Sequence, residues 1–282
     1  MDLHVSISAE TLFEFDIPIL GTFHFTNSFL TMLIVMIGLI VGGWLLAKRS
    51  TMVPTRSQSI FEMLVEFLLG IVEAAAGPRI GRRIFPLVGG LFIFILLANY
   101  AGLLPGVGTI GHYESEDESH ASVASVALLQ ADSEEEVNGE EEVLVPWFRS
   151  PSADLNMTLA MSILVVFIVQ AVGIMAHGVG GRIKHMADPW WIFPIELVGE
   201  LARIISLAFR LFGNIFAGEV LVAVMVAFGV AAYFVLTPLT TIFLFFEVLI
   251  GFIQALVFAI LTVIYIALAA AGHGDGEEAH AH

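Results

Sequence analysis

Residues 206–219, SLAFRLFGNIFAGE, place an arginine, an asparagine and a glutamate within a long run of apolar residues. The run covers residues 190–232 and is longer than the roughly 20 residues that a helix needs to cross a bilayer. A charged side chain in the middle of a membrane helix costs about 2.5–3.5 kcal/mol on insertion scales. The pattern therefore predicts a membrane helix in which Arg210 is a candidate functional residue.

The composition of the whole chain agrees with a membrane protein. Its 282 residues are 58% hydrophobic and 13% charged. A helix satisfies its own backbone hydrogen bonds in lipid, so the expected class is an all-α polytopic membrane protein. The net charge of -16 argues against nucleic acid as a partner. The chain has no cysteine, which excludes disulfides and cysteine-bound metals.

The apolar runs predict about five membrane-embedded helices in a single membrane domain. A further helix, residues 59–76, has Glu62, Glu66 and Glu73 at helical spacing, which favours an amphipathic helix on the membrane surface. Residues 1–28 are expected to form an outer N-terminal segment, residues 105–154 an acidic outer loop and residues 272–282 a tail. The predicted membrane helices are residues 29–47, 84–104, 155–176, 190–232 and 236–271.

The basic residues predict the orientation of the chain. Of the eleven Lys and Arg, six lie between the first two predicted spans, from Lys48 to Arg83, and Arg182 and Lys184 follow the third span. The positive-inside rule then puts the N-terminus outside and, after five crossings, the C-terminus inside. No positive region begins the chain, so we do not expect a cleaved signal peptide.

The loop at 105–154 contains the acidic stretch ADSEEEVNGEEE. Blocks of like charge repel one another, which favours a solvated, partly disordered insertion. A surface that collects cations at a channel mouth is the alternative. The tail GHGDGEEAHAH is interpreted as a flexible solvated end, with a metal-binding tail as the alternative.

Arg210 shares one face of its helix with polar and small residues. At about 100° per residue, the positions within about 60° of it include Arg203, Ser206 and Asn214. Glu200 is spaced to pair with Arg203, whereas Glu219 falls on the face opposite to Arg210. We therefore expect Arg203 to have a local partner and Arg210 to take its counter-charge from another helix or another chain. Gly213 and Ala217, also on this face, would let another helix approach closely.

The last predicted helix carries a second polar set. Glu247, Gln254 and Tyr265 lie close to one stripe of an otherwise apolar helix. Acidic residues within membrane segments are usually functional, so Glu219 and Glu247 are candidates for taking up and releasing protons. The structural alternative is that Glu247 only forms a hydrogen bond between helices.

At these residues the chain resembles subunit a of the F-type ATP synthase, the stator subunit of its membrane sector. Four segments carry the resemblance in order, and they cover most of the chain outside the acidic loop and the two ends. They are FILLANYAGLLPG at 94–106, SPSADLNMTLA at 150–160, SLAFRLFGNIFAGE at 206–219 and GFIQALVFAILTVIYIALA at 251–269.

The resemblance implies a proton channel made of two half-channels that lead to carboxylates on a rotating ring of c subunits. Arg210 matches the essential arginine of the family, whose counter-charge would be the ring carboxylate. The last two long helices would form a tilted hairpin facing this ring. The implied site residues near Arg210 and in the outer half-channel are Asn214, Glu219, Glu247 and Gln254, with Ser206 bordering the inner route and Asp154 and Asn156 in an outer polar motif.

The position of Glu247 is histidine in some relatives, so a relay here would run between two carboxylates. The resemblance also implies b-type peripheral stalk subunits, membrane lipid and protons as partners, and a bacterial plasma membrane as the location. No Gly-rich nucleotide loop is present, so the chain is expected to be a non-catalytic subunit without a cofactor. Proton is preferred over sodium because no cluster of oxygen ligands stands out.

Two other classes of membrane protein are alternatives to this prediction. A self-contained ion channel or secondary transporter would bind an anion at Arg210, but it predicts an internal repeat, and the two halves show none. A structural scaffold would pair Arg210 with Glu200 or Glu247. It predicts that loss of the arginine harms assembly instead of pumping.

Overall fold

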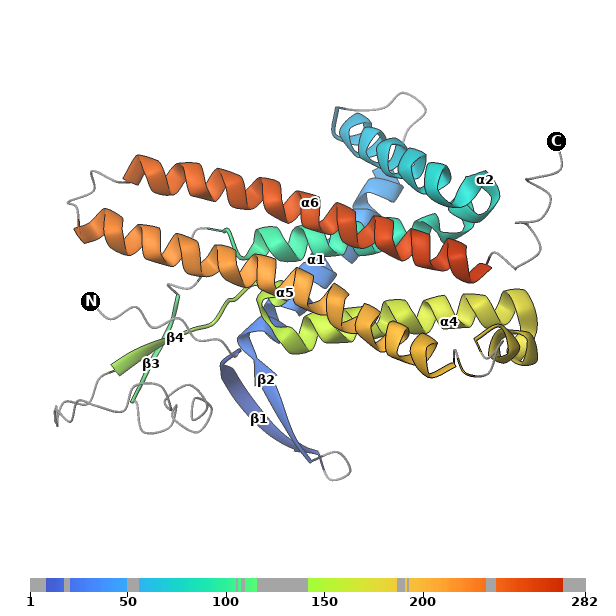
Figure 1. The fold of residues 1–282 in the computed structure, drawn as a ribbon. Coiled ribbons are helices and arrows are strands. Elements are labelled where there is room, and N and C mark those ends of the chain that lie inside the picture. The colour runs from blue at the N-terminus through green and yellow to red at the C-terminus, as the bar shows by residue number, and fades with distance from the viewer. Residues whose placement is uncertain are drawn as a thin grey trace.

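The structure is a computed structural model with five long helices and two short β-hairpins (Figure 1). It describes residues 9–17, 21–49, 56–104, 106–107, 110–115, 142–186, 191, 193–231 and 237–270. The long helices are α1 (Asn27–Arg49), α2 (Arg56–Ala101), α4 (Leu155–Met186), α5 (Phe193–Ala231) and α6 (Thr237–Ala270). Within the described residues, five helices are long and apolar enough to cross a membrane, which confirms the predicted fold class.

A break at Gly77 divides α2 into two helical halves. Gly77 has φ 75° and ψ 160°, a conformation that is essentially restricted to glycine. Pro78 follows, and proline is favoured at the first position of a helix because its missing N–H has no partner there. Across the break, Arg82 Nε donates to Glu73 Oε1 at 2.6 Å. The predicted surface helix is the half before Gly77, and its position on a membrane surface stays a prediction.

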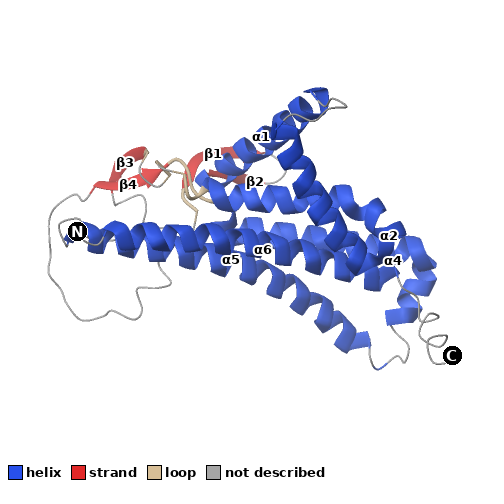
Figure 2. Cartoon of the chain, turned by 90° about the horizontal axis from the view of Figure 1, so that it is seen from above, coloured by secondary structure: helices blue, strands red, loops and turns tan. Residues whose placement is uncertain are grey.

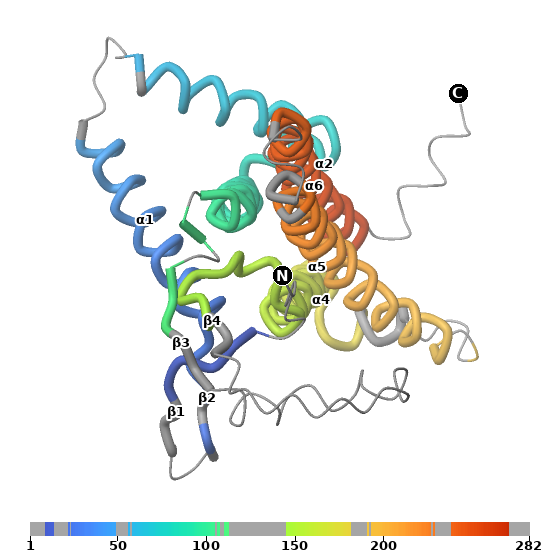
Figure 3. The backbone as a smooth tube through the Cα atoms, turned by 90° about the vertical axis from the view of Figure 1, so that its left-hand side faces the viewer, coloured from blue at the N-terminus to red at the C-terminus, as the bar shows by residue number. Residues whose placement is uncertain are grey.

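The core lies where α2 packs with α4, α5 and α6, and the first half of α2 contributes Leu68 and Val72 to it. Phe92 of α2 and Phe258 of α6 are fully buried, and the Phe92 ring meets that of Phe252 edge-on at 5.8 Å between centroids. In Figure 3 α4, α5, α6 and the second half of α2 run roughly toward the viewer, whereas α1 and the first half of α2 lie across them. The packed helices therefore form one bundle with α1 at its side.

The last two helices form an antiparallel hairpin, lying side by side in Figures 1 and 2. With 39 residues, α5 is about 58 Å long, well beyond the roughly 30 Å of a hydrocarbon core. Tilting is one way for a helix of this length to fit a bilayer. The hairpin was expected from the family resemblance; its tilt in a membrane and its contact with a ring stay predictions.

Two β-hairpins lie near the start of α1, in segments for which no strands were expected (Figure 1). β1 (Thr11–Ile17) pairs antiparallel with β2 (Gly21–Thr26), where LFEFDI and TFHFT alternate apolar and polar residues. β3 (Gly111–Ser115) pairs with β4 (Glu142–Pro146), so the two ends of the acidic loop are joined. Most of the acidic sequence, and the tail at 272–282, fall outside the described residues.

A buried segment connects β4 to α4. It contains the short helix η3 (Pro151–Ala153), which contacts α1, α2, α4 and α5. The three residues of η3 are all buried. This segment therefore reaches the interior of the bundle, close to the end that carries the hairpins.

Candidate functional site

Arg210 lies near the middle of α5 with its side chain exposed. Its Nη2 donates to Ser206 Oγ, one turn earlier, at 3.4 Å. Among the described residues, no carboxylate lies within ion-pair distance of Arg210. The structure thus brings Ser206 and Arg210 together and leaves the charge of Arg210 unneutralised within the described chain.

The face around Arg210 is open to a neighbouring helix. A Cβ placed on Gly213 would meet nothing within 4 Å, and Ala217 is exposed. Phe209 is 53% exposed beside them. Small residues next to an exposed apolar side chain are typical of close helix packing within membranes.

Asn214 and Gln254 connect α5 to α6 directly beside Arg210. Asn214 Nδ2 donates to Gln254 Oε1 at 3.3 Å. Gln254 is buried, and its Nε2 has no hydrogen-bond partner in the described part of the chain. Asn214 lies one turn beyond Arg210, so the polar face of α5 continues along the contact with α6.

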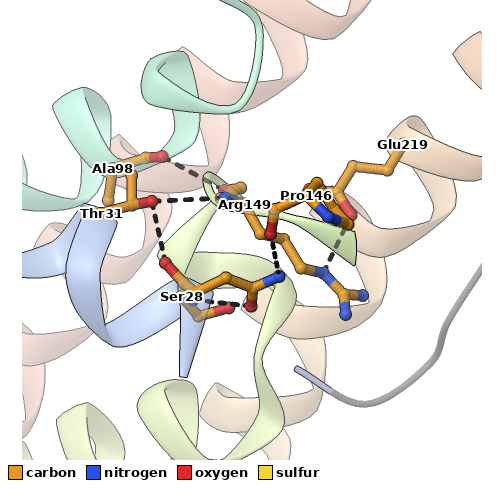
Figure 4. Close-up of polar contacts among 8 residues, drawn as sticks. Ser28, Thr31, Ala98, Pro146, Arg149 and Glu219 are labelled. Carbon is orange, nitrogen blue, oxygen red and sulfur yellow. Dashed lines mark hydrogen bonds and ion pairs between the residues drawn. The ribbon is translucent and has the colours of Figure 1, made fainter. Parts of the chain in front are cut away.

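Glu219 lies nine residues beyond Arg210, about 13 Å further along the helix axis. Its Oε2 is 3.7 Å from Arg149 Nε (Figure 4). The Arg149 side chain is 10% exposed and that of Glu219 is 24% exposed. This ion pair joins the segment before η3 to α5.

Glu247 of α6 is buried against α5 at Gly218. A Cβ on Gly218 would lie 2.8 Å from Glu247 Cδ, closer than real Cβ atoms approach. Glu247 also lies near enough to interact electrostatically with Glu219. Its Oε2 has no hydrogen-bond partner among the described residues. The two acids predicted as a relay therefore lie together at the α5–α6 contact, as neighbours in space.

Two residues of α2 hold α6 in place next to Glu247. Tyr100 Oη donates to the Val248 carbonyl and Asn99 Nδ2 to the Gly251 carbonyl, each at 3.1 Å. These bonds go to backbone groups in the turn that follows Glu247. The position of the buried carboxyl group is thereby tied to α2 as well as to α5.

Arg203 belongs to a separate ion pair in the first half of α5. Its Nη1 lies 2.8 Å from Glu200 Oε1, and its guanidinium stacks over the Tyr265 ring at 4.4 Å from the centroid. The predicted local partner of Arg203 is thus confirmed. Because Glu200 is engaged here, and Glu247 lies at Gly218, neither provides the pairing with Arg210 that a scaffold would require.

Asp154 and Asn156 do not join this polar group. Asp154 is buried and stands before the first residue of α4, where its Oδ1 accepts from Asn156 N at 2.9 Å. That is the bond of a helix N-cap, a structural task. The Asn156 side chain is exposed. Within the described residues, neither side chain hydrogen-bonds to the polar residues of α5 or α6.

Reasoning from the sequence missed Arg149 and Gly218. Arg149 is 70 positions from its partner, and no periodicity connects the two. One feature of the sequence could have pointed to Arg149, because it is the one lysine or arginine between residues 105 and 154. No group of three or more His, Asp or Glu that could hold a metal ion occurs among the described residues.

The fold and the site define a class: a polytopic helical membrane protein with ionisable side chains gathered along the contact of its two last helices. A family model described as "ATP synthase A chain" matches residues 29–267. The chain belongs to this family, and the resemblance to subunit a of the F-type ATP synthase is confirmed. The family is that of a membrane-sector subunit, and its members act as parts of a multi-subunit complex.

Several relatives are similar in sequence to this chain over most of their length. "ATP synthase subunit a" of Desulforamulus reducens is 35% identical over 226 residues, which cover 79% of this chain and 70% of the relative. The protein of the same name from Desulfosudis oleivorans is 32% identical over 271 residues, covering 93% and 94%. "ATP synthase subunit a 2" of Syntrophotalea carbinolica is 32% identical over 284 residues, covering 99% and 94%.

Proposed function

We propose that this chain is the proton-conducting stator of its complex, with two half-channels that meet a ring of c subunits at Arg210. The observation that carries the proposal is the exposed Arg210, in the middle of a membrane helix, with no carboxylate partner in the described chain. An arginine stays protonated in proteins, and an unpaired charge in a membrane is costly. Its counter-charge is therefore supplied from outside the chain, by the carboxylate of each c subunit in turn.

The proposed outer half-channel follows the polar side chains between the hairpin end and Arg210. A proton enters near Glu219 and Glu247, passes the pair Asn214–Gln254 and is taken up by a ring carboxylate. The contacts that support this order are the shared location of the two acids and the hydrogen bond between Asn214 and Gln254. Ser206, on the other side of Arg210, borders the inner half-channel.

Arg210 performs two tasks in this scheme. Its charge favours the ionised form of a ring carboxylate that approaches it, so the arriving acid releases its proton toward the inner side. It also places a positive charge between the half-channels, so that protons cross only by rotation of the ring. Each proton carries about 2.3 kcal/mol per 100 mV of membrane potential, and rotation transfers this energy to the catalytic sector.

The orientation of the chain follows from the distribution of charge along the bundle. Lys48 lies at the end of α1 remote from the hairpins, and Arg79, Arg82 and Arg83 directly follow the break in α2. By the positive-inside rule we place this end in the cytoplasm and the hairpins outside. The relatives are bacterial proteins, which supports a plasma membrane location with b-type stalk subunits as further partners.

The experiment compares ATP-driven acidification of inside-out vesicles that contain the assembled complex. Arg210→Ala is expected to abolish pumping while the complex still assembles. The matched control is the double variant Glu200→Gln/Arg203→Gln, which removes an ion pair from the same helix at a distance from Arg210. It is expected to pump. Coupled pumping by Arg210→Ala would refute the proposal.

A further inference from the structure

The segment that leads into η3 is tied to two different helices (Figure 4). On the α1 side, Asn27 Nδ2 donates to the Pro146 carbonyl at 3.1 Å, and Arg149 N donates to Thr31 Oγ1 at 3.3 Å. On the α2 side, Ser150 Oγ donates to the Ala98 carbonyl at 3.2 Å. The backbone on both sides of Arg149 is therefore anchored.

Close packing strengthens the anchor on the α2 side. A Cβ on Gly102 would lie 2.7 Å from Ser150 Cβ, so only a glycine lets the segment lie this close. Asn27 and Ser150, which make two of these hydrogen bonds, are fully buried. Buried polar groups that are bonded in this way fix one arrangement, because any other would leave them without partners.

The anchored backbone directs the Arg149 guanidinium toward α5. The side chain is almost fully buried, and its Nε lies 3.7 Å from Glu219 Oε2. A buried guanidinium keeps its charge and needs a counter-ion. On this side Glu219 meets Arg149, and Glu247 of α6 packs against Gly218, the residue that precedes Glu219.

We propose that Arg149 is a positioning residue of the outer ion path, which fixes the Glu219 carboxylate at the α5–α6 contact beside Glu247. The inference rests on the proposed function, since it gives Arg149 a task only if Glu219 passes protons. It also assigns a task to Thr31 of α1, because Thr31 accepts the backbone N–H of Arg149. A helix remote from the α5–α6 hairpin thus sets the geometry of the path.

The contact with Glu219 is made through Nε, an atom that lysine lacks. A lysine has a carbon where arginine has Nε, and its ammonium group lies one bond further along the side chain. With the backbone anchored, Arg149→Lys keeps the charge but moves the charged nitrogen relative to the Glu219 carboxylate. Arg149→Lys is therefore expected to pump at a rate between those of the wild type and Arg149→Gln.

The first test uses a double-mutant cycle of pumping rates in inside-out vesicles with the assembled complex. A positioned proton-transfer group contributes about 10²–10⁴-fold, so Arg149→Gln is expected to slow pumping about tenfold or more. In a Glu219→Gln background, the same substitution is expected to cause no further loss, because Arg149 acts through Glu219. Multiplicative losses, or wild-type pumping by Arg149→Gln, would overturn the inference.

The second test leaves both charges in place and compares two buried threonines. Thr31 and Thr262 each donate to the carbonyl four residues earlier, but only Thr31 also accepts the Arg149 N–H. Thr31→Val is expected to slow pumping several-fold, and Thr262→Val to leave it unchanged. Equal pumping rates for the two threonine variants would contradict the inference. This test remains decisive if Arg149→Gln does not assemble.

Arg210→Ala, measured in parallel, separates the two proposals. Coupled pumping by Arg210→Ala refutes the proposed function whatever the Arg149 variants do. If Arg210→Ala is inactive and Arg149→Gln pumps normally, the inference about Arg149 fails alone.

Discussion

Gly218 of α5 lies directly against the carboxyl group of Glu247 of α6, so tightly that a Cβ at position 218 would overlap it. This contact places the buried Glu247 at the helix hairpin, against the residue that precedes Glu219. Adding a single methyl group at position 218 would therefore displace a side chain of the proposed ion path. The contact provides the first prediction.

Gly218→Ala is expected to displace the Glu247 carboxyl group and to slow proton pumping, while the complex still assembles. The control is Gly199→Ala on the same helix, where an added Cβ meets nothing within 4 Å. ATP-driven acidification of vesicles measures both variants. Equal rates for the two would show that the position of Glu247 does not limit proton transfer.

The Glu200–Arg203 pair is expected to contribute to stability and not to coupling. Breaking a buried ion pair costs about 3–5 kcal/mol, and the 25% exposure of Arg203 should bring the loss below that range. Arg203→Gln should therefore lower the thermal stability of the assembled complex and leave the ratio of protons pumped to ATP hydrolysed unchanged. A variant that assembles with normal stability but is uncoupled would place Arg203 in the ion path instead.

The break in α2 depends on the positive φ of Gly77. Backbone strain of this kind costs about 1–3 kcal/mol for a residue with a Cβ, so Gly77→Ala should lower the midpoint of thermal unfolding of the complex. Gly70→Ala is the matched control, because Gly70 lies in the same helix and an added Cβ there meets nothing within 4 Å. Equal midpoints would show that α2 tolerates a continuous helix at this point.

The proposed orientation can be tested with single cysteines, since the chain has none of its own. Thr22 in the N-terminal hairpin and Gly181 near the end of α4 are both exposed. In intact cells, a membrane-impermeant thiol reagent should label a cysteine at position 22 and leave one at position 181 unlabelled. The reverse pattern would invert the proposed topology.

Local patterns were enough to predict the helices and the ion pair within one turn of α5. The Glu200–Arg203 spacing is a property of one helix, and the absence of an acid on the stripe of Arg210 could be read from the same periodicity. The alternation in FEFDI is a local signal typical of the strand that the structure has there.

The contacts that the sequence could not supply are those between distant segments. Asn214 and Gln254 could be identified as polar positions, but their hydrogen bond depends on the register between α5 and α6. The Arg149–Glu219 pair depends on how a loop packs among α1, α2, α4 and α5. Such contacts follow from tertiary packing, which leaves no periodic signal in the chain.

The central claim is that the charge of Arg210 separates two half-channels, and passive proton leak tests it most directly. Vesicles with the assembled complex, held without ATP, receive a potassium diffusion potential while a pH-sensitive dye reports proton entry. Arg210→Ala is expected to leak protons faster than the wild type, and an inhibitor that blocks ring rotation should not stop this leak. An Arg210→Ala complex that stays as proton-tight as the wild type would contradict the claim.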